Sequence, residues 1–436
     1  MQVKTKPTYV GGEMKQSRFN AKAKLLSLVA IGAVSVATLM PMQSASAATE
    51  LRFMSWAWQD THITVLKNLV AQWNKANPSI PVKLELVDEE GLYTQLSTGF
   101  LAGTAPDVID TEAAAALQYA KSGYLYNLAP DLRSIQKEIN PGIWSTVSYK
   151  AKVFGAPWMI EQYMVVANLD LFKKLGVAVP KQTDEMSWSD LRALAKKVTT
   201  ADMPGIGVGL GSAAKLTMVM GPTVGAKYFT GITTGAKPKL IQGAAELEVV
   251  KQINDMIQVD KSLSSRYVSS NPQTDFLAGK LPLWFTKNSL ANTIDLQSDI
   301  KYQYLPMISG SGGSKQAPTA GIYAVSAQSK QTKNSVKFVK FLMEAQNLAL
   351  TNIAVGGSIP GTTSGQAAVK AIKKDSNWQF LMSQGANLTT APFLFVPQWE
   401  AWKGSFQNPQ AKLLYTGKIT LDEYKKAVAN GWAGLR

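Results

Sequence analysis

The stretch from Phe100 to Glu112 constrains the fold of this chain more than any other. Gly103 suits the left-handed residue that ends a helix, and Pro106 prevents the helix from continuing. The short apolar run 107–110 then predicts a strand buried on both faces. In an open α/β sheet the residues just past such a strand line the ligand crevice, so we expect Asp110, Thr111 and Glu112 on a binding surface.

The segments before this stretch alternate between strand and helix patterns. We expect strands over 50–54 and 82–87 and, between them, a helix capped by Asp60 or Thr61 and stopped by Asn77. The order strand, helix, strand, helix, strand predicts a parallel sheet with right-handed crossovers. The loops around Trp58, Glu89 and Thr111 would then share one rim.

The first 47 residues have the pattern of an export signal. Basic residues precede the apolar run 25–40, and Ala45-Ser46-Ala47 fits a small-residue cleavage site. A membrane anchor is the alternative, but the run falls short of the roughly 18 to 20 residues that span a bilayer. We therefore expect a cleaved signal peptide over 1–47 and a mature protein that is periplasmic or secreted at the cell envelope.

The charge and the cysteine content of the chain exclude some classes of function. The chain has no cysteine, so disulfides, thiolate metal sites and a lipid-accepting cysteine are not expected. Of its 45 basic and 30 acidic residues, six and one lie in 1–47, which leaves 39 against 29 and a formal charge of +10. The basic residues are scattered, which favours solubility or weak attraction to an anionic envelope over nucleic-acid binding.

The rest of the chain continues the α/β pattern and then becomes helical. Two extended runs flank Gly155-Ala156-Pro157, as expected of a chain that passes from one sheet to another. Helices are expected over 169–175, from Trp188 behind a capping-box-like Ser187, over 244–259 and over 335–343. Strands are expected over 206–210, 281–285, 302–307 and 321–326, followed mostly by helices up to Leu435.

Six short motifs follow one another along the mature chain. They are A-G-T-A-P-D-V at Ala102, Y-K-A-K-V-F-G-A-P at Tyr149, V-A-N-L-D-L-F-K-K-L-G at Val166, S-W-S-D-L at Ser187, F-L-A-G-K at Phe276 and Y-L-P-M at Tyr304. In order and spacing they resemble the extracellular solute-binding proteins of sugar ABC importers, the maltose-binding-like family 1. The similarity covers nearly all of the chain after Ala48.

The resemblance implies an α/β fold with two lobes, each built on a doubly wound sheet, joined by crossing hinge strands and completed by a C-terminal helical region. Crossings are implied at 158–163, 305–308 and 357–361. Lobe 1 would comprise 48–160 plus 307–356, and lobe 2 would comprise 161–306 plus 357–436. A monomer that hands its solute to a membrane permease is implied as well.

A sugar presents apolar CH faces and many hydroxyl groups, so its site needs flat aromatics beside carboxylates and amides. Six tryptophans fall at strand ends or in loops: Trp56, Trp58, Trp158, Trp284, Trp399 and Trp402. Each is also consistent with a core filler; we favour Trp58, Trp158 and Trp399 as ligand contacts. Glu161 matches an acidic position of the family that binds sugar hydroxyls, with a solvated hinge carboxylate as its alternative.

The chain departs from the family where Lys287-Asn288-Ser289 replaces a Gly-x-Trp and Glu112-Ala113-Ala114 lacks an aromatic. Trp284 would then supply a stacking surface, and the amides of Asn288 and Gln162 could meet hydroxyl groups. The ligand-binding residues expected from the sequence are Trp58, Glu89, Asp110, Thr111, Glu112, Trp158, Glu161, Trp284, Asn288, Tyr323 and Trp399.

Two other functions remain open at this point. A cleft carbohydrate hydrolase would use two of the carboxylates Asp110, Glu112 and Glu161, although any polyol site gathers carboxylates too. A polyamine or other non-sugar solute is the second alternative. The only histidine, His62, is expected at the cleft rim, and no catalytic residue, cofactor or metal site is expected.

Overall fold

The computed structural model describes residues 50–57, 59–232 and 236–435. Residues 48–436 form one compact unit. The predicted signal peptide 1–47 and Trp58 lie outside the described residues. Within the described part of the chain, no helix is long and apolar enough to cross a membrane.

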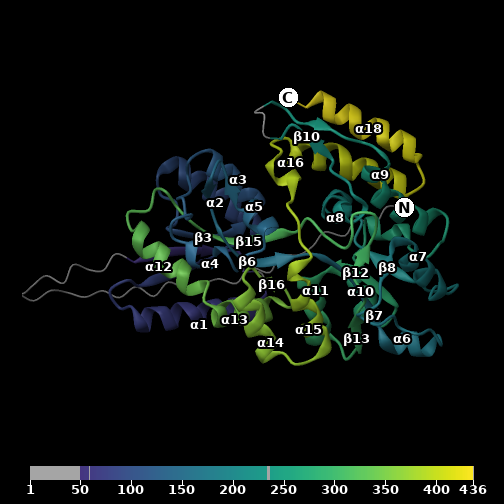
Figure 1. The fold of residues 1–436 in the computed structure, drawn as a ribbon, viewed down its shortest axis with the longest axis horizontal. Coiled ribbons are helices and arrows are strands. Elements are labelled where there is room, and N and C mark those ends of the chain that lie inside the picture. The colour runs from purple at the N-terminus through teal and green to yellow at the C-terminus, as the bar shows by residue number, and fades with distance from the viewer. Residues whose placement is uncertain (1–49, 58, 233–235, 436) are drawn as a thin grey trace, which may run out of the picture. The chain divides into compact units, whose positions relative to one another are not determined.

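Among the described residues, six strands form the sheet of the first lobe, here called the large sheet (Figure 1). Strand β1 pairs in parallel with β2 and β3, as the sequence pattern predicts, whereas β15 pairs antiparallel with β3 and β6. The strands, in their order across the sheet, are β16 (Ile359–Pro360), β6 (Ala156–Glu161), β15 (Thr319–Val325), β3 (Val108–Glu112), β1 (Leu51–Ser55) and β2 (Val82–Leu86).

Helices cover both faces of the large sheet, so its apolar side chains are enclosed in one core with Phe53, Trp73 and Phe338 (Figure 1). One face is covered by α1 (Asp60–Ala76), α12 (Thr332–Leu342) and α13 (Ala345–Val355), and the other by α2 (Glu89–Ala102) and α3 (Ala113–Lys121). Helix α1 begins behind Gln59 with no side-chain cap, which corrects the capping role predicted for Asp60 or Thr61. Gly103 adopts the left-handed conformation at the end of α2, as predicted.

Four further described strands form the small sheet of the second lobe. Across that sheet they are β13 (Tyr302–Tyr304), β7 (Tyr163–Asn168), β12 (Leu283–Lys287) and β9 (Ile206–Val208). Two-residue strands pair elsewhere: β4 (Ser148–Tyr149) with β5 (Lys152–Val153), β8 (Met186–Ser187) with β14 (Ile308–Ser309), and β10 (Phe229–Thr230) with β11 (Lys239–Leu240).

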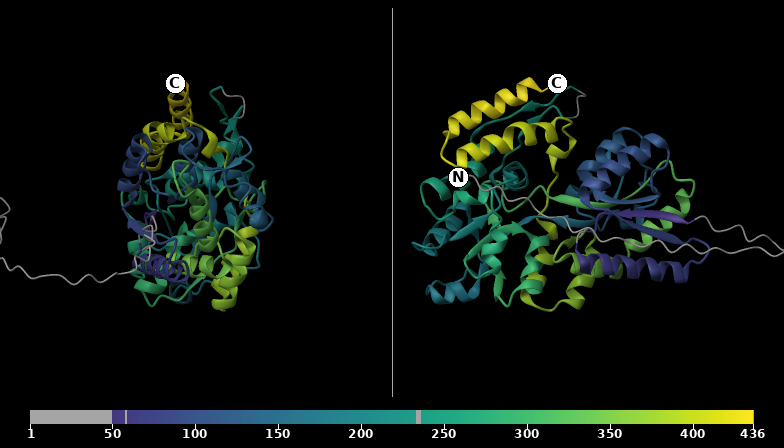
Figure 2. Two further views of the ribbon diagram at one scale, coloured as in Figure 1. Left: turned by 90° about the vertical axis from the view of Figure 1, so that its left-hand side faces the viewer. Right: turned by 180° about the vertical axis from the view of Figure 1, so that it is seen from behind.

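The remaining helices belong mostly to the second lobe and the C-terminal region. They are α4 (Arg133–Gln136), α5 (Pro141–Thr146), α6 (Leu169–Lys174), α7 (Trp188–Lys197), α8 (Ala213–Met220), α9 (Ala244–Gln258), α10 (Pro272–Leu277), α11 (Asn288–Gln297), α14 (Thr363–Ile372), α15 (Ser376–Ser383), α16 (Trp399–Trp402), α17 (Asn408–Tyr415) and α18 (Leu421–Gly434). Helix α17 packs against α8 and α9, and α18 packs against α17 at the C-terminal end of the chain (Figure 2). Trp402 and Trp432 join the core of the small sheet.

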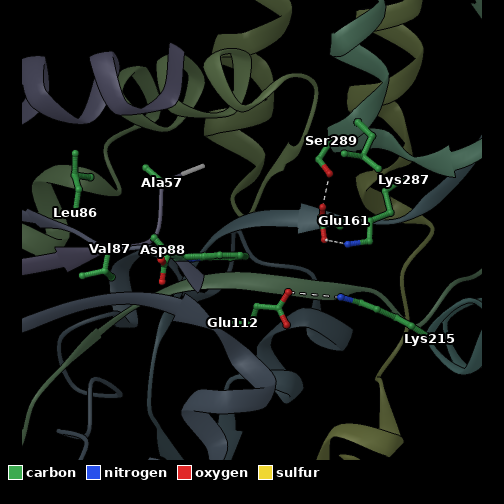
Figure 3. Close-up of a pocket in the computed structure, with 11 residues that line it drawn as sticks. Ala57, Leu86, Val87, Asp88, Glu112, Glu161, Lys215, Lys287 and Ser289 are labelled. Atoms are coloured by element: carbon green, nitrogen blue, oxygen red, sulfur yellow. Dashed lines mark hydrogen bonds and ion pairs between the residues drawn. The ribbon is translucent and has the colours of Figure 1, made fainter. Parts of the chain in front are cut away.

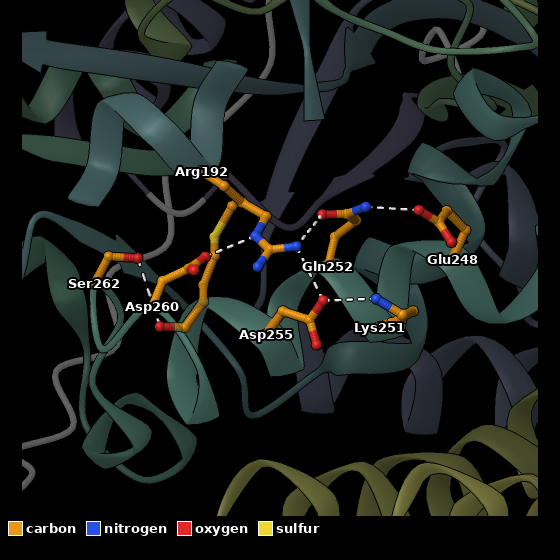
Figure 4. Close-up of polar contacts among 8 residues, drawn as sticks. Arg192, Glu248, Lys251, Gln252, Asp255, Asp260 and Ser262 are labelled. Carbon is orange, nitrogen blue, oxygen red and sulfur yellow. Dashed lines mark hydrogen bonds and ion pairs between the residues drawn. The ribbon is translucent and has the colours of Figure 1, made fainter. Parts of the chain in front are cut away.

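A polar network fastens α7 to the end of α9 (Figure 4). The Arg192 guanidinium donates to Asp260 at 2.6 Å, to Asp255 at 2.9 Å and to Gln252 at 3.2 Å. The capping box that starts α7, between Ser187 and Asp190, forms as the sequence predicts. The network holds the outer helices of the second lobe and lies apart from the pocket described below.

The chain passes between the sheets at Gln162, which separates β6 of the large sheet from β7 of the small sheet. The Asn288 amide joins this crossing to the segment before β16. It accepts a hydrogen bond from the Gln162 N–H at 2.9 Å and donates to the carbonyls of Ile160 at 3.2 Å and Gly357 at 2.9 Å. Gln316, on the segment that leads back to the large sheet, bonds both the N–H and the carbonyl of Tyr163. Two buried amides therefore fasten the crossing segments together.

Candidate functional site

A pocket of about 700 Å³ lies between the end of the large sheet and the edge of the small sheet (Figure 3). It is lined by Trp56, Ala57, Leu86, Val87, Asp88, Glu112, Glu161, Lys215, Lys287, Ser289 and Leu290. The first seven belong to segments of the large sheet, and the other four to α8, β12 and α11. The pocket therefore spans both lobes.

The large-sheet wall follows from the parallel order of its strands. Strands β1, β2 and β3 end at the same edge, which brings Trp56, Asp88 and Glu112 to one rim. The sequence predicts this shared rim, and the pocket forms there. Asp88 also caps helix α2 through a hydrogen bond from the Gly91 N–H at 2.6 Å, so its position is held by local structure.

The wall from the second lobe supplies hydrogen-bond donors. Lys287 is the last residue of β12, Ser289 follows at the start of α11, and Lys215 projects from α8. Lys287 Nζ donates to Glu161 at 2.9 Å, and the Ser289 hydroxyl donates to the other oxygen of the same carboxylate. The Thr319 hydroxyl lies 3.4 Å from Glu161.

These contacts keep Glu161 ionised. Burial by itself would raise the pKa of Glu161, but the charges of Lys287 and Lys215 and the hydrogen bond from Ser289 outweigh it and lower the pKa to about 2. Burial likewise opposes the charge of Lys287, yet Glu161 and Glu112 raise its pKa. The pair is therefore a charged one at neutral pH.

A second ion pair crosses the pocket. The Glu112 carboxylate, at the end of β3, lies 3.5 Å from Lys215 Nζ on α8, and both side chains are about one-fifth exposed, at 23% and 21%. Positive and negative charges therefore alternate along the pocket floor in Glu112, Lys215, Glu161 and Lys287. Such a floor offers both donors and acceptors to a neutral polar ligand.

Asp110 lies beneath the pocket and is fully buried. It accepts hydrogen bonds from the Ser55 hydroxyl at 2.7 Å and the Trp158 indole at 2.9 Å. Burial raises the pKa of Asp110 to about 7, against the hydrogen bonds from Ser55, Trp158 and Trp56. Asp110 therefore holds the end of β1, and with it Trp56 of the pocket wall, instead of lining the pocket as predicted.

The structure corrects the aromatic part of the predicted site. Trp158, Trp284, Trp399 and Tyr323 are all at most 4% exposed and do not line the pocket. Trp158 stacks on Tyr323 in the core of the large sheet, Trp284 packs against Phe276, and Trp399 against Phe393. The pattern places a tryptophan near a strand end but does not say which side of the strand faces the core. Trp56 is the aromatic that reaches the pocket among the described residues.

Three polar residues also lie elsewhere than expected. Asn288 is fully buried, and its amide forms hydrogen bonds with the crossing segments instead of facing a ligand. Thr111 is buried, and among the described residues its hydroxyl has no hydrogen-bond partner. His62 is buried beside Trp158, with ring centroids 5.3 Å apart, and burial lowers its pKa to about 3, so it does not lie at the rim.

Glu112 and Glu161 are the predicted residues that line the pocket. Glu89 begins helix α2, one residue after the pocket residue Asp88; its side chain is not described. Sequence reasoning missed Lys215, for which no local pattern gives a signal. It noted Lys287 and Ser289 only as part of a departure from the family pattern. Among the described residues, no group of three or more potential ligands could hold a metal ion.

Comparison with known proteins now identifies the family. The family model described as "Bacterial extracellular solute-binding protein" matches residues 60–349. This chain belongs to that family. An uncharacterized lipoprotein of Streptomyces antibioticus is 27% identical over 95% of this chain and 92% of its own length. The arabinooligosaccharide-binding protein of Bacillus subtilis is 25% identical over 68% of this chain and 69% of its own length.

Solved structures of this solute-binding family share the fold. An ABC substrate-binding protein of Listeria monocytogenes, in complex with cycloalternan, superimposes with a TM-score of 0.71 over 88% of this chain and 97% of its own. Its sequence identity is 18%, so the likeness concerns the fold alone. The two-lobed α/β architecture with a helical C-terminal region, which the sequence predicts, is confirmed.

Proposed function

We propose that this protein captures an oligosaccharide in the pocket between its lobes and delivers it to the membrane permease of an ABC importer. One observation carries the proposal. The pocket joins an apolar wall, with Trp56, Leu86 and Leu290, to a floor of alternating donors and acceptors. Sugar hydroxyl groups both donate and accept, so they match the charged floor, and sugar CH faces are apolar, so they match the apolar wall.

The relatives support the same ligand class. The name of the Bacillus subtilis relative specifies arabino-oligosaccharides, and the Listeria monocytogenes structure contains cycloalternan. The volume of about 700 Å³ falls within the range of roughly 300 to 1,000 Å³ that is usual for small-molecule pockets. Closure of the lobes on the ligand would be favoured only by the difference in affinity between the closed and open forms.

A hydrolase fits this pocket less well. A glycosidase needs a carboxyl group that holds a proton near neutral pH, yet the pKa of Glu161 is lowered to about 2. Asp110 has the raised pKa, but it is buried below the pocket. We therefore propose that the bound sugar is released unaltered, which incubation with labelled oligosaccharides tests directly.

A polyamine also fits less well. Three carboxylates line the pocket, but Glu112 and Glu161 are already paired with Lys215 and Lys287. Those two ammonium groups would repel the further ammonium groups of a polyamine. A neutral polyol experiences no such repulsion and finds a partner in each charged group. The structure therefore favours a sugar over a polycation.

The deciding experiment is titration calorimetry of the mature protein with arabino-, malto- and cellodextrin-type oligosaccharides, with spermidine as the comparison. The proposal expects one-to-one binding of at least one saccharide and no product on prolonged incubation. Binding of spermidine alone, or cleavage of the saccharide, would refute it.

We further propose lobe boundaries near 160/161, 306/307 and 356/357. These lie at the crossings, where Glu161 at the end of β6 and the short strand β16 still pair within the large sheet. We also propose a monomer in solution and export of a mature chain that begins at Ala48 without a lipid anchor. The Streptomyces relative is described as a lipoprotein, whereas this sequence contains no cysteine. The intact mass of the exported protein tests the mature N-terminus and the lipid anchor, and its elution on a calibrated sizing column tests the monomer.

A further inference from the structure

A second concavity of about 850 Å³ lies between the strand β11 and the C-terminal helix α18. We call it the C-terminal groove. It is lined by Lys237, Pro238, Lys239, Leu240, Gln242, Asp422, Lys425, Lys426, Ala429, Asn430, Trp432 and Ala433. None of these residues lines the interlobe pocket, and the groove belongs to the second lobe alone.

The groove is strongly basic. Of the described residues that line it, four are lysines and one is an aspartate. Lys237 has a local partner: its Nζ donates to the carbonyls of Trp432 and Leu435, and it lies 5.2 Å from the Trp432 ring. Because the last carbonyls of a helix lack partners within it, Lys237 acts as the cap of α18.

The other three lysines have no close ion-pair partner among the described residues. Lys239, Lys425 and Lys426 are exposed, and no acidic side chain of the described residues lies within ion-pair distance of them. The hydrogen bonds from Thr420 and, after them, the charge of Lys426 lower the pKa of Glu423 earlier on α18. Three like charges around one concavity repel one another, and that arrangement is stabilised by an anion that lies between them.

The sequence of α18 explains why the charges gather there. Its capping box joins Thr420 to Glu423 and fixes where the helix starts. Tyr424, Val428 and Trp432 then recur every fourth residue and face the core, so Lys425 and Lys426 lie on the flank beside β11. Lys239, on β11, lies on the opposite wall of the groove.

We propose that the C-terminal groove binds a linear polyanion of the cell envelope whose phosphate groups recur along a flexible chain. A concave channel of about 850 Å³ accommodates a chain, and three ammonium groups on two walls can contact successive phosphates. Such contacts release condensed counterions, so the affinity depends on salt. The groove would hold the exported protein at the envelope while the interlobe pocket stays free.

The composition of the groove favours this partner over an acidic protein. Specific protein interfaces are rich in arginine and exposed aromatic anchors and poor in lysine. The groove contains lysine but no arginine among its lining residues, and its one tryptophan is 6% exposed with its N–H bonded to Pro238. A flat bilayer is also disfavoured, because the buried Trp432 has no surface with which to insert.

The test compares two charge-reversed variants of the full mature protein. In the groove variant Lys239, Lys425 and Lys426 become Glu. In the control variant Lys333, Lys337 and Lys340 become Glu; these three are exposed on one face of α12 and line no groove described here. Both variants change the net charge by the same amount, so they separate the groove from a general charge effect.

The probe is a short poly(glycerol phosphate), with phosphatidylglycerol vesicles and an acidic peptide as comparisons, titrated from about 50 to 200 mM salt. We expect the wild type and the control variant to bind the polymer with a log–log salt slope near about −2, as for three neutralised phosphates. The groove variant should bind at least tenfold more weakly, with oligosaccharide affinity unchanged.

Three results would overturn the inference: no binding of the polymer by the wild type, an equal loss in both variants, or binding only to vesicles or to the peptide. A groove variant that fails to fold would be recognised by its lost oligosaccharide binding. The single substitution Lys425→Gln, on the exposed flank of α18, then replaces it, with an expected loss of a few-fold and a shallower salt slope. Unchanged polymer binding by Lys425→Gln would overturn the inference in that case.

Discussion

The Glu112 carboxylate lies 3.5 Å from the Lys215 ammonium group across the pocket, which joins the end of strand β3 in the large sheet to helix α8 of the second lobe. The other ion pair of the floor, between Glu161 and Lys287, is more deeply buried and is reinforced by Ser289. The pocket therefore has one ion pair that a ligand can readily displace and one that is fixed in place. We expect changes in the Glu112–Lys215 pair to report on lobe closure, and changes in the Glu161–Lys287 pair to report on the free energy of unfolding.

The Glu112–Lys215 pair is expected to couple weakly in a double-mutant cycle. With Glu112→Gln, Lys215→Met and the double variant, we expect a coupling free energy of unfolding of about 0.3 to 1 kcal/mol, because both side chains are partly exposed. The coupling should fall in 1 M salt, where screening is strong. Denaturant titration at low and high salt measures it; a coupling of zero at low salt would show that the pair does not join the lobes in solution.

The two indoles near the pocket should respond to truncation in different ways. Trp56→Ala is expected to weaken oligosaccharide binding by roughly 1 to 3 kcal/mol, since it removes apolar surface from the pocket wall. Trp158→Ala should instead lower the free energy of unfolding by about 3 to 5 kcal/mol, because that side chain is fully buried against Tyr323. Calorimetry and denaturant unfolding on both variants separate the effects, and unchanged affinity in Trp56→Ala would exclude that ring from the site.

The ionised Glu161 predicts a specific pH dependence. Its pKa is lowered to about 2 in the folded protein, so its contribution to stability is present above the unfolded value of 4.5 and is lost as the pH falls from 4.5 toward 2. Glu161→Gln should remove the loss of unfolding free energy that this carboxylate causes between pH 4.5 and about pH 2. It should also lower the free energy of unfolding at pH 7 by about 3 kcal/mol, because Lys287 is left unpaired.

The matched control for Glu161 is Glu400→Gln. Glu400 pairs with Lys403, but its side chain is 63% exposed. The control should change stability by less than about 1 kcal/mol. If the two variants had identical pH profiles of unfolding between pH 2 and pH 5, the buried pair would not be the source of the effect.

The Asn288 amide should matter for the fold and not for direct contact with the ligand. Asn288→Ala leaves the Gln162 N–H and the carbonyls of Ile160 and Gly357 without that partner, which is expected to cost about 2 to 4 kcal/mol of stability. Asn68→Ala, on the exposed face of α1, is the control and should be nearly neutral. Full stability together with lost oligosaccharide binding in Asn288→Ala would instead place the amide at the ligand.

The third crossing depends on glycine at two positions. Gly357 has a φ of +102°, and a Cβ at Gly361 would lie 1.8 Å from the Pro157 carbonyl oxygen. Gly361→Ala is therefore expected to force β16 away from β6 and to destabilise the protein by more than about 2 kcal/mol. Thermal unfolding measures this effect, and Gly404→Ala, whose Cβ would meet open space, is the control. Equal melting temperatures for the two variants would contradict the close packing at this crossing.

The sequence by itself determined the fold class, the parallel order of the first strands and the shared rim where they end. These features follow from local signals: apolar runs, the glycine that ends α2, and the capping box of α7. The same strand signals placed Glu112 at that rim, whereas Glu161 was expected at the site only from the resemblance to the solute-binding family.

Only the tertiary structure decided which side chains reach the pocket. Both Trp56 and Trp158 are expected at strand ends from the sequence, yet Trp158 lies within β6 and is enclosed in the core, whereas Trp56 follows β1 and lines the pocket. That choice depends on which face of the sheet the helices α1 and α13 cover, and this packing is not encoded locally. Lys215 is 103 residues from Glu112 in the sequence, so their ion pair exists only because the crossing segments bring the lobes together.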